Sequence, residues 1–224
     1  MNRSITTSRG RITIRDATPT DAMSFRELRL EALQDSPTAF SADYQKNLNQ
    51  PAKYWEDRLT MDADEATIFL AEHEGKLIGM TGILRGSSPK TRHGAWIWGV
   101  YVTPEWRGLR IAEELINSCF AWAKARNIVV VKLGVAATNI SAIRCYERCG
   151  FSTYGSEPRA LFYEGKYYDE FLMSCALDES SFTRSTSQSN NKSSETAVRA
   201  LRAHVAELES RIDLLYTHLG VTRI

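Results

Sequence analysis

One stretch of the chain runs directly from a β-rich apolar segment through a glycine turn into a helical pattern. Residues 95–102 (AWIWGVYV) are rich in β-branched and aromatic side chains, and Pro104 ends the run. Beyond Gly108, apolar residues recur at helical spacing, and small or apolar neighbours widen the stripe: Ile111, Leu115, Cys119 and Trp122, flanked by Ala112, Ile116 and Ala123. A helix with so broad an apolar face must be well covered. The stretch therefore predicts an α/β domain in which this helix packs on a sheet.

The segment before this stretch carries its own strand and helix signals. Residues 11–17 (RITIRDA) alternate in polarity as a strand does. The sequence TPTD then predicts a helix start, with Thr18 as N-cap, Pro19 in the first turn and Asp21 near the positive helix end. The buried stripe expected for this helix consists of Phe25, Leu28, Ala32 and Leu33.

The remaining patterns complete an order of β, α, α, three strands, α, β, α and two strands. A second helix is expected within 51–61, and TIFLAEHEGKLIGMTGILR predicts two strands that turn at Glu74-Gly75. After the central helix we expect a strand at 129–136, a helix at 139–149 that closes at Gly150, and two strands around 151–156 and 168–177. The order predicts a mixed α/β sheet, mostly antiparallel in its early part and crossed by a helix later.

Charge and hydropathy exclude several classes of function. The chain has 224 residues and a formal net charge of +1, so it lacks the electropositive field of non-specific nucleic-acid binding. Residues 1–10 (MNRSITTSRG) contain no apolar core, and no apolar run approaches the ~20 residues of a membrane span. We expect a cytoplasmic protein with a disordered tail at 1–10 and a domain at 11–178.

The four cysteines do not follow the spacing of a metal site. They lie within apolar or helical patterns rather than in Cys-x-x-Cys pairs: Cys119, Cys145, Cys149 and Cys175. This placement predicts reduced, mostly buried thiols and no metal site. Two of them, Cys145 and Cys149, are spaced to share one helix face.

The composition changes after residue 178. Residues 179–194 form a Ser- and Asn-rich polar tract that predicts a flexible linker. Within 195–220, apolar residues then recur at alternating steps of three and four: Val198, Leu201, Val205, Leu208, Ile212, Leu215 and Leu219. This heptad pattern predicts a parallel two-stranded coiled coil that would join a homodimer. An amphipathic helix packed back on its own domain gives a similar stripe, and the linker favours self-association.

The glycine turn of the opening stretch has the properties of an anion site. Backbone N–H groups at a helix N-terminus are unpaired, and the helix dipole adds partial positive charge. Arg107 and Arg110 bracket Gly108, which permits close backbone approach, and Ala112 is small. A diphosphate would suit this turn. The alternative is that Gly108 only makes the turn and the arginines are solvated.

A second stretch, LGVAATNISAIRCYERCGF at 133–151, contains a second motif. Together the two stretches resemble the GNAT (Gcn5-related N-acetyltransferase) superfamily. Its first signature is Arg or Gln, two residues, Gly, one residue, then Gly or Ala; here Arg110 stands at the expected glycine. Its second signature is intact in Asn139, Ala142, Tyr146, Arg148, Gly150 and Phe151. The resemblance spans about 11–177.

The resemblance implies a fold and a co-substrate. The fold would be a GNAT-like mixed, mostly antiparallel sheet, flanked by helices, with a V-shaped splay between two central strands. Acetyl-CoA would bind in this splay. By position, the backbone of Val100, Tyr101 and Val102 would bind the pantetheine arm and the thioester carbonyl. The pyrophosphate would lie against Arg107, Gly108, Leu109, Arg110, Ile111 and Ala112. Asn139 would contact the pantetheine arm or order the site, with Ala142 and Arg148 in the same motif.

The resemblance also implies transfer of the acetyl group to a primary amine of a small molecule or a peptide, by direct attack in a ternary complex. A thioester is already activated, so the enzyme aligns the amine, stabilises the oxyanion and manages two protons. Tyr146 is the candidate acid for the departing thiolate, and the alternative is a tyrosine that packs its helix on the sheet. No carboxylate lies in 95–102 to act as base. Three nearby groups fit surface positions better: Glu72, His73 and His93.

The acceptor site is less well specified by the sequence. Candidate acceptor-binding residues are Phe40, Tyr44, Trp98 and Tyr168. Further aromatic and acidic candidates are Trp55, Trp96, Tyr163, Tyr167, Asp169 and Glu170. A second hypothesis is a catalytically weak acyl-CoA-binding module with a regulatory or scaffolding role. The departure at Arg110 and the missing strand carboxylate favour the module, and the intact region around Tyr146 favours the enzyme.

Overall fold

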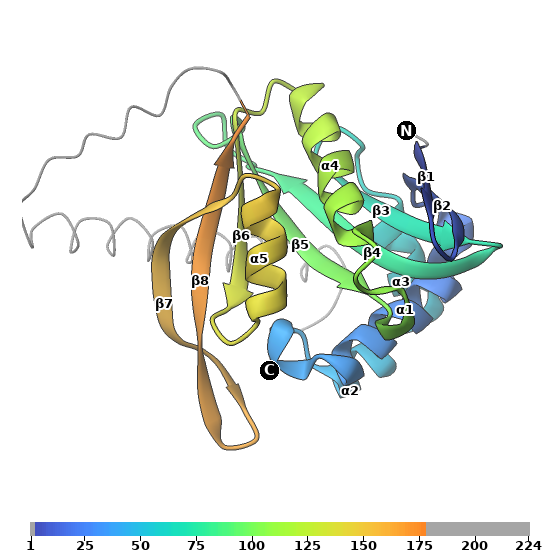
Figure 1. The fold of residues 1–224 in the computed structure, drawn as a ribbon, viewed down its shortest axis with the longest axis horizontal. Coiled ribbons are helices and arrows are strands. Elements are labelled where there is room, and N and C mark those ends of the chain that lie inside the picture. Colours follow the sequence, from blue (N-terminus) through green and yellow to red (C-terminus); the bar gives the residue numbers. More distant parts are fainter. Residues whose placement is uncertain (1–2, 178–224) are drawn as a thin grey trace, which may run out of the picture. The chain divides into compact units, whose positions relative to one another are not determined.

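The computed structural model describes residues 3–177, in which eight strands form one sheet in the order β1-β2-β3-β4-β5-β6-β8-β7 (Figure 1). Every neighbouring pair is antiparallel except β5 and β6. The strands are β1 (Arg3–Thr7), β2 (Gly10–Asp16), β3 (Ala66–His73), β4 (Lys76–Arg85), β5 (Gly94–Val102), β6 (Val130–Ala136), β7 (Ser152–Tyr163) and β8 (Lys166–Ala176). This confirms the predicted GNAT-like mixed, mostly antiparallel sheet.

The two central strands, β5 and β6, separate after a short parallel ladder. They pair only between residues 94–96 and 130–132, while β6 stays paired with β8 as far as Ala136. A β-bulge in β5 inserts one extra residue against β4, and Gly99 there has a φ of +68°. Such a backbone suits glycine, which lacks a Cβ. The strands thus diverge into the predicted V-shaped splay.

Helices cover both faces of the sheet and enclose two separate cores. Helices α4 (Ile111–Lys124) and α5 (Ile140–Arg148) lie on one face, and Figure 1 shows both in front of the strands. Helices α1 (Ala22–Asp35) and α3 (Ala52–Leu59) pack on the other face, against those side chains of β3 and β4 that point away from α4. The expected stripe of α1 is buried: Phe25, Leu28 and Ala32 belong to that second core, and Leu33 is buried as well.

Short elements complete the chain between these helices and strands. Helix α2 (Tyr44–Leu48) was not expected from the sequence, and the Asp43 side chain caps it by accepting a hydrogen bond from the Lys46 N–H at 2.7 Å. Three-residue 3₁₀ turns precede or follow the longer helices at Pro19–Asp21, Pro37–Ala39 and Pro104–Trp106. None of the helices in the described range is both long and apolar enough to cross a membrane.

The structure corrects two expectations about the ends of the domain. The tail expected to be disordered at 1–10 contains strand β1, which pairs with β2 at the sheet edge, because its Ile5 alternates with polar residues and packs on the core. Strand β7 also continues beyond the expected 151–156 to Tyr163, and β8 begins at Lys166 instead of 168, because their ladder continues through residues that are mostly exposed and show no buried stripe. The linker and helix expected at 179–194 and 195–220 lie outside the described residues.

An ion-pair network joins the start of α1 to the sheet. The Arg15 guanidinium donates to both carboxylate oxygens of Asp21, at 2.8 and 2.7 Å, and to Glu72 at 2.8 Å. The backbone N–H and the hydroxyl of Thr18 also donate to Asp21, which completes the predicted N-terminal cap. The hydrogen bond from Arg15, opposed by burial and supported by Thr18, lowers the pKa of Asp21 to about 2.

We expect Asp21→Asn to lower the free energy of unfolding by about 2 kcal/mol at neutral pH. The folded pKa of Asp21 lies below its unfolded value, so its contribution is complete above about pH 4 and disappears as the pH falls towards about 2. Urea unfolding of wild type and variant at several pH values measures the difference. The curves should converge in acid, whereas Asp57→Asn, at an exposed i,i+4 pair with Lys53, should change little at any pH.

Candidate functional site

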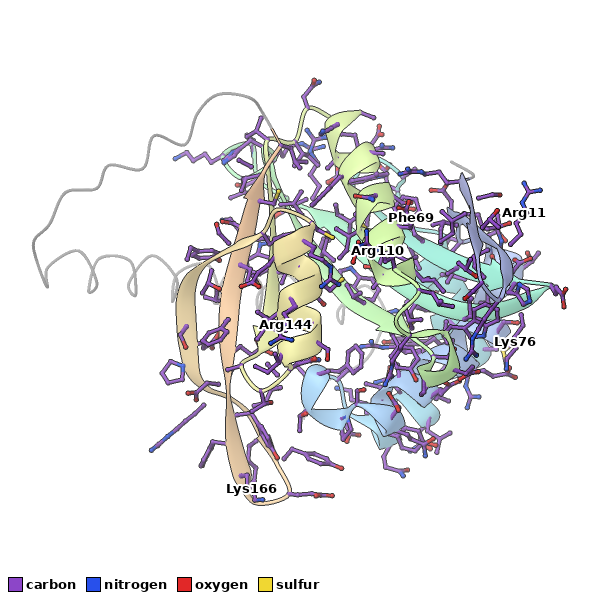
Figure 2. All side chains as sticks on the ribbon, viewed as in Figure 1. Arg11, Phe69, Lys76, Arg110, Arg144 and Lys166 are labelled. Atoms are coloured by element: carbon purple, nitrogen blue, oxygen red, sulfur yellow. The ribbon has the colours of Figure 1, made fainter. Side chains whose placement is uncertain are left out.

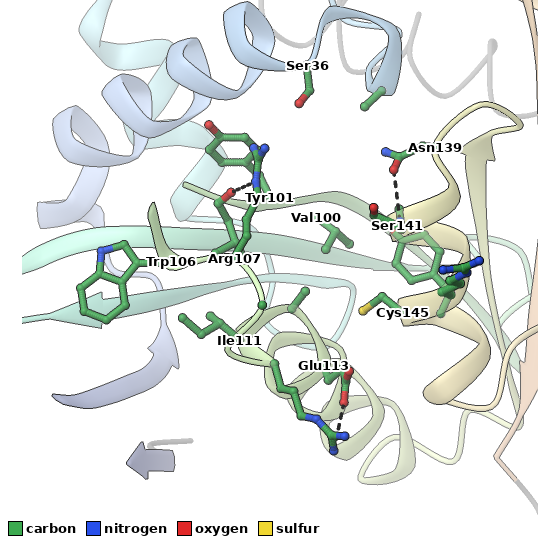
Figure 3. A pocket seen from close by; sticks show the side chains of 18 of the residues that line it. Ser36, Val100, Tyr101, Trp106, Arg107, Ile111, Glu113, Asn139, Ser141 and Cys145 are labelled. Carbon is green, nitrogen blue, oxygen red and sulfur yellow. Dashed lines mark hydrogen bonds and ion pairs between the residues drawn. The ribbon is translucent and has the colours of Figure 1, made fainter. Parts of the chain in front are cut away.

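A cleft of about 710 Å³ opens where β5 and β6 separate. Strand β5 forms its floor, the turn before α4 forms one wall and α5 forms the other. Figure 3 shows Val100 and Tyr101 along β5, with Ser141 and Cys145 on α5 across from them. Ser36 and Ala39 at the end of α1 and in the following turn close one end of the cleft.

The cleft brings together most of the site residues predicted from the two motifs. Those that line it are Val100, Tyr101, Val102, Arg107, Gly108, Arg110, Ile111, Ala112, Asn139, Ala142, Tyr146 and Arg148, together with the acceptor candidate Phe40. Leu109 does not line it, because its apolar side chain packs against the core on the α4 face. The two motifs are far apart in sequence, and the splay places them on opposite sides of one cavity.

Three of the four acceptor candidates lie outside the cleft lining. Trp98 packs on the second core beneath Arg58, whose guanidinium carbon lies 5.1 Å from its ring centre. Tyr44 begins α2, and Tyr168 pairs with Leu161 in the β7–β8 hairpin. The further candidates are also absent from the lining: Trp55, Trp96, Tyr163, Tyr167, Asp169 and Glu170.

The three groups considered as bases also lie elsewhere. Glu72 is held by Arg15 at 2.8 Å, and His73 packs against Trp106 with ring centres 4.6 Å apart. His93 is exposed in the loop before β5. Among the described residues, Glu113 is the only carboxylate that lines the cleft. The Arg148 Nε donates a hydrogen bond to its Oε1 at 2.7 Å.

Seven lining residues were not predicted from the sequence to belong to the site. They are Ser36, Ala39, Trp106, Glu113, Ser141, Arg144 and Cys145. Five of these lie inside the two motif stretches, next to or within one helical turn of a residue that was predicted, so their spacing alone could have suggested them. Ser36 and Ala39 reach the cleft only through the tertiary placement of α1, which local sequence does not encode.

The turn before α4 presents its backbone to the cleft. The first helical hydrogen bond of α4 runs from the Glu114 N–H to the Arg110 carbonyl, so the N–H groups of Ile111, Ala112 and Glu113 precede the ladder. No side chain caps this helix end. Gly108 has a φ of +79°, and a Cβ added there would meet no atom within 4 Å. The turn therefore combines free donors, positive dipole and open space at one point.

The Arg107 side chain is committed to the protein rather than to the open cleft. Its Nε donates to the Val102 carbonyl at 3.0 Å, its Nη2 forms a short ion pair with Asp35, and its guanidinium stacks 5.5 Å from the Tyr101 ring centre. Burial alone would raise the pKa of Asp35, but the hydrogen bonds from Arg107 and Ser36 bring it below its ordinary value. Arg107 thus anchors the turn to α1 and to the end of β5.

Three other arginines surround the open side of the cleft. Arg110 and Arg148 flank Glu113, with contacts of 4.0 and 2.7 Å, and their side chains are 76% and 51% exposed. Figure 2 shows Arg110 beside α4 and Arg144 on α5, on the face of the sheet that these helices cover. A polyanionic ligand would meet positive charge on both walls.

Arg110 occupies a left-handed backbone conformation, with a φ of +61°. This conformation explains why the family pattern has glycine at this position, because a residue with a Cβ is strained by about 1 kcal/mol at such a φ. The Arg110 side chain points into solvent, where it can attract an anion from the side without blocking the turn.

We therefore expect Arg110→Gly to leave the free energy of unfolding equal or up to about 1 kcal/mol higher, because relief of strain offsets the greater freedom of the unfolded chain. The same change should weaken binding of coenzyme A, and added salt should shrink the loss. Titration calorimetry at low and high salt measures both. Tighter binding of coenzyme A by the variant would show that Arg110 obstructs the turn instead.

Tyr146 lies in the wall of the cleft formed by α5 and is 8% exposed. Burial, with smaller contributions from Cys145 and Cys149, raises the pKa of its hydroxyl above the ordinary value, so the phenol keeps its proton at neutral pH. Within the described residues, no group forms a hydrogen bond with this hydroxyl. Its ring contacts Phe151, so both predicted interpretations, packing and proton donation, have a structural basis.

Two further α5 residues have defined local roles. The Asn139 side chain accepts a hydrogen bond from the Ala142 N–H at 3.1 Å and so caps α5, which orders this wall. Cys145 and Cys149 lie on one helix face as predicted, and a hydrogen bond between them, together with burial, raises the pKa of Cys149. All four cysteines are free thiols, two of them buried.

The comparisons with known proteins agree with this geometry. The model of the acetyltransferase (GNAT) family matches residues 27–151. An uncharacterised N-acetyltransferase of Methanocaldococcus jannaschii is 33% identical over 141 residues, which are 62% of this chain and 60% of the relative. The chain spans less than two thirds of the length of the curated relatives that it matches.

Solved structures share the fold over most of this chain. A GNAT-family acetyltransferase from Streptococcus pneumoniae superposes with a TM-score of 0.67 at 25% identity, covering 74% of this chain and 99% of that one. A putative acetyltransferase from Salmonella typhimurium, solved with its cofactor acetyl-CoA, gives a TM-score of 0.62 at 21% identity over 76% and 96% of the two chains. With a family model that matches more than half of its residues, the chain belongs to the acetyltransferase (GNAT) family.

Proposed function

We propose that the protein is an acetyl-CoA-dependent N-acetyltransferase that transfers acetyl to a primary amine in a ternary complex. The observation that carries the proposal is the uncapped N-terminus of α4, with open space at Gly108, beside the splay of β5 and β6. These features fit a long ligand that has a diphosphate at one end and an amide-containing arm at the other.

Each part of such a ligand has a matching group on this chain. The N–H groups between Gly108 and Glu113 would bind the diphosphate, and Arg144 and Arg148 would surround it with positive charge. The edge of β5 that faces β6 has no ladder partner after Trp96, so its N–H and C=O groups can bind an extended arm as an added strand would. When bound, acetyl-CoA supplies an acetyl group already activated as a thioester.

The chain's own residues would then position the acceptor and move protons. Tyr146 holds a proton on a hydroxyl that has no other described partner, and it faces the cleft from α5. It would donate this proton to the leaving thiolate. The cleft is enclosed on the side of Ser36, Ala39 and Phe40, and this enclosure would orient the amine and exclude water.

The second candidate is a catalytically weak acyl-CoA-binding module. One observation favours this module: Glu113, the carboxylate that lines the cleft within the described residues, accepts a hydrogen bond from Arg148. It is therefore not free to act as a base. The presence of Tyr146 in the same cavity favours the enzyme. The two candidates share the binding site and differ in turnover.

Thiol release from acetyl-CoA separates the two candidates. The protein is mixed with acetyl-CoA and, in turn, small alkylamines, polyamines, amino acids and peptides with a free N-terminus or lysine. If the protein is an enzyme, the rate of thiol release rises with the concentration of one class of amine. A binding module gains thermal stability from coenzyme A but releases thiol with none of them.

A further inference from the structure

Arg29, on the inner face of α1, is a buried cation, and no carboxylate of the described residues is paired with it. Its exposed fraction is 8%, and its Nη1 has no hydrogen-bond partner among the described residues. Burial, followed by the positive charge of Arg58, lowers its pKa to about 10. A buried guanidinium without a carboxylate is unfavourable by several kcal/mol, so chains seldom keep one without a function.

The groups around Arg29 are aromatic or positively charged. Its guanidinium carbon lies 4.7 Å from the ring centre of Phe40. Arg58 approaches from α3, donates to the Tyr54 hydroxyl at 2.8 Å and stacks on the ring of Trp98. These contacts place two cations among aromatic rings, where their positive charge would attract an anion.

Arg29 lies just outside the cleft lining, next to the bulge of β5. A Cβ built on Gly99 would lie 3.6 Å from the Arg29 Nη1, and the next residue, Val100, lines the cleft. Phe40, which covers the guanidinium, lines the cleft too. Arg29 comes from α1 on one face of the sheet, whereas the turn at Gly108 leads into α4 on the other. The two groups of cations therefore belong to opposite faces of the sheet.

We propose that Arg29, together with Arg58, binds a carboxylate of the acceptor, so that the acceptor is an amino acid or a similar small amine that carries a carboxylate. The proposal rests on the proposed acetyl transfer and adds the chemical class of the acceptor. A planar guanidinium can hold a carboxylate through two parallel hydrogen bonds, which would satisfy the unpaired Nη1 and fix the distance to the neighbouring amine.

The first test compares acceptors that differ only at the anion. The probes are L-alanine, L-methionine, L-phenylalanine and L-glutamate, the α-carboxamide of each, 1-aminoethylphosphonate and alanyl-alanine amide. Thiol release should give a KM at least about 10-fold lower for amino acids than for their carboxamides, since a hydrogen-bonded charge pair is lost in the latter. Equal KM values, or preference for the phosphonate or the peptide amide, would overturn a carboxylate site.

The second test removes the cation. Arg29→Met should raise the KM for the amino acids by about 10- to 100-fold and leave the KM values for the carboxamides and acetyl-CoA unchanged. Arg29→Lys, which keeps the charge but not the fork, should recover part of the loss. The control Lys53→Met removes an exposed cation from the same helix as Arg58 and should leave all values unchanged.

Thermal unfolding distinguishes a binding role from a structural one. Arg29→Met should melt at the same temperature as wild type or higher, because it removes an uncompensated buried charge. A large drop in the melting temperature would mean that Arg29 serves the fold and would overturn the proposal.

Binding without turnover separates this proposal from the proposed function. If no amine releases thiol, the proposed transfer fails, and the carboxylate site is judged by melting in the presence of coenzyme A. Amino acids should then stabilise wild type more than their carboxamides do, and the difference should vanish in Arg29→Met. Equal stabilisation of both proteins by both probe series would overturn the carboxylate site.

Discussion

Replacing Tyr146 with phenylalanine should lower kcat by about 10²- to 10⁴-fold, the usual contribution of a general acid. The hydroxyl has no hydrogen-bond partner among the described residues, so its removal should leave the melting temperature and the Kd of acetyl-CoA nearly unchanged. Steady-state kinetics with the preferred amine, beside titration calorimetry with acetyl-CoA, measures both quantities.

The matched control for this change is Tyr154→Phe. Tyr154 lies on β7, is 45% exposed and is absent from the cleft lining, so the loss of its hydroxyl should not alter turnover. If Tyr146→Phe turns over as fast as wild type, Tyr146 is a packing residue and another group protonates the thiolate.

Gly108→Ala should weaken acetyl-CoA binding by about 10-fold or more. The methyl group would occupy the open space in which, on the proposed function, a diphosphate would approach the backbone, and the positive φ would be strained by about 1 kcal/mol. Titration calorimetry gives the affinity, and urea unfolding gives the stability.

Gly165→Ala provides a close match for the strain alone. Gly165 has a φ of +77°, a Cβ there would also meet nothing within 4 Å, and it lies in the β7–β8 hairpin outside the cleft lining. Both variants should lose similar stability, but only Gly108→Ala should lose affinity. An equal affinity for acetyl-CoA in the two variants would mean that the turn does not contact the ligand.

Much of the fold could be predicted because local patterns and tertiary packing agree in this chain. The stretch AWIWGVYV became β5, and the apolar stripe after Gly108 became a helix whose Leu115 and Cys119 are fully buried. The turn signals at Thr18 and at Glu74-Gly75 also lie where the structure places a cap and a hairpin. Elements with strong periodicity were therefore the ones that sequence could locate.

The strands of the terminal hairpin show where such patterns end. Residues in the second half of β7 are mostly exposed, so their side chains carry no alternation. These residues pair with β8 through backbone hydrogen bonds, which leave no trace in the pattern of side chains.

The motif residues of the cleft were predictable, whereas their local partners were not. Arg107 was expected beside a bound anion, yet it anchors the turn by bonding to Val102 and Asp35, the latter brought close only by the placement of α1. The left-handed backbone at Arg110 explains a motif departure that looked arbitrary in sequence. Most acceptor candidates chosen by aromatic content lie outside the cleft lining, since Trp98 packs on the second core and Tyr168 lies in the β7–β8 hairpin.

The burial of Arg29 is a feature that the sequence alone conceals. In the helical pattern of α1 it looks like one of several solvated arginines, and only burial against Phe40 and Arg58 distinguishes it. Its burial and its unpaired Nη1 arise from the tertiary packing of α1 against α3 and β5, which local sequence does not encode.

The most direct test of the account is the mass spectrum of an acceptor amine after incubation with the protein and acetyl-CoA labelled in the acetyl group. We expect the label on the amine nitrogen, in an amount equal to the coenzyme A released and greatly reduced by Tyr146→Phe. Release of labelled acetate with unmodified amine, or no release with any amine tested, would contradict an N-acetyltransferase.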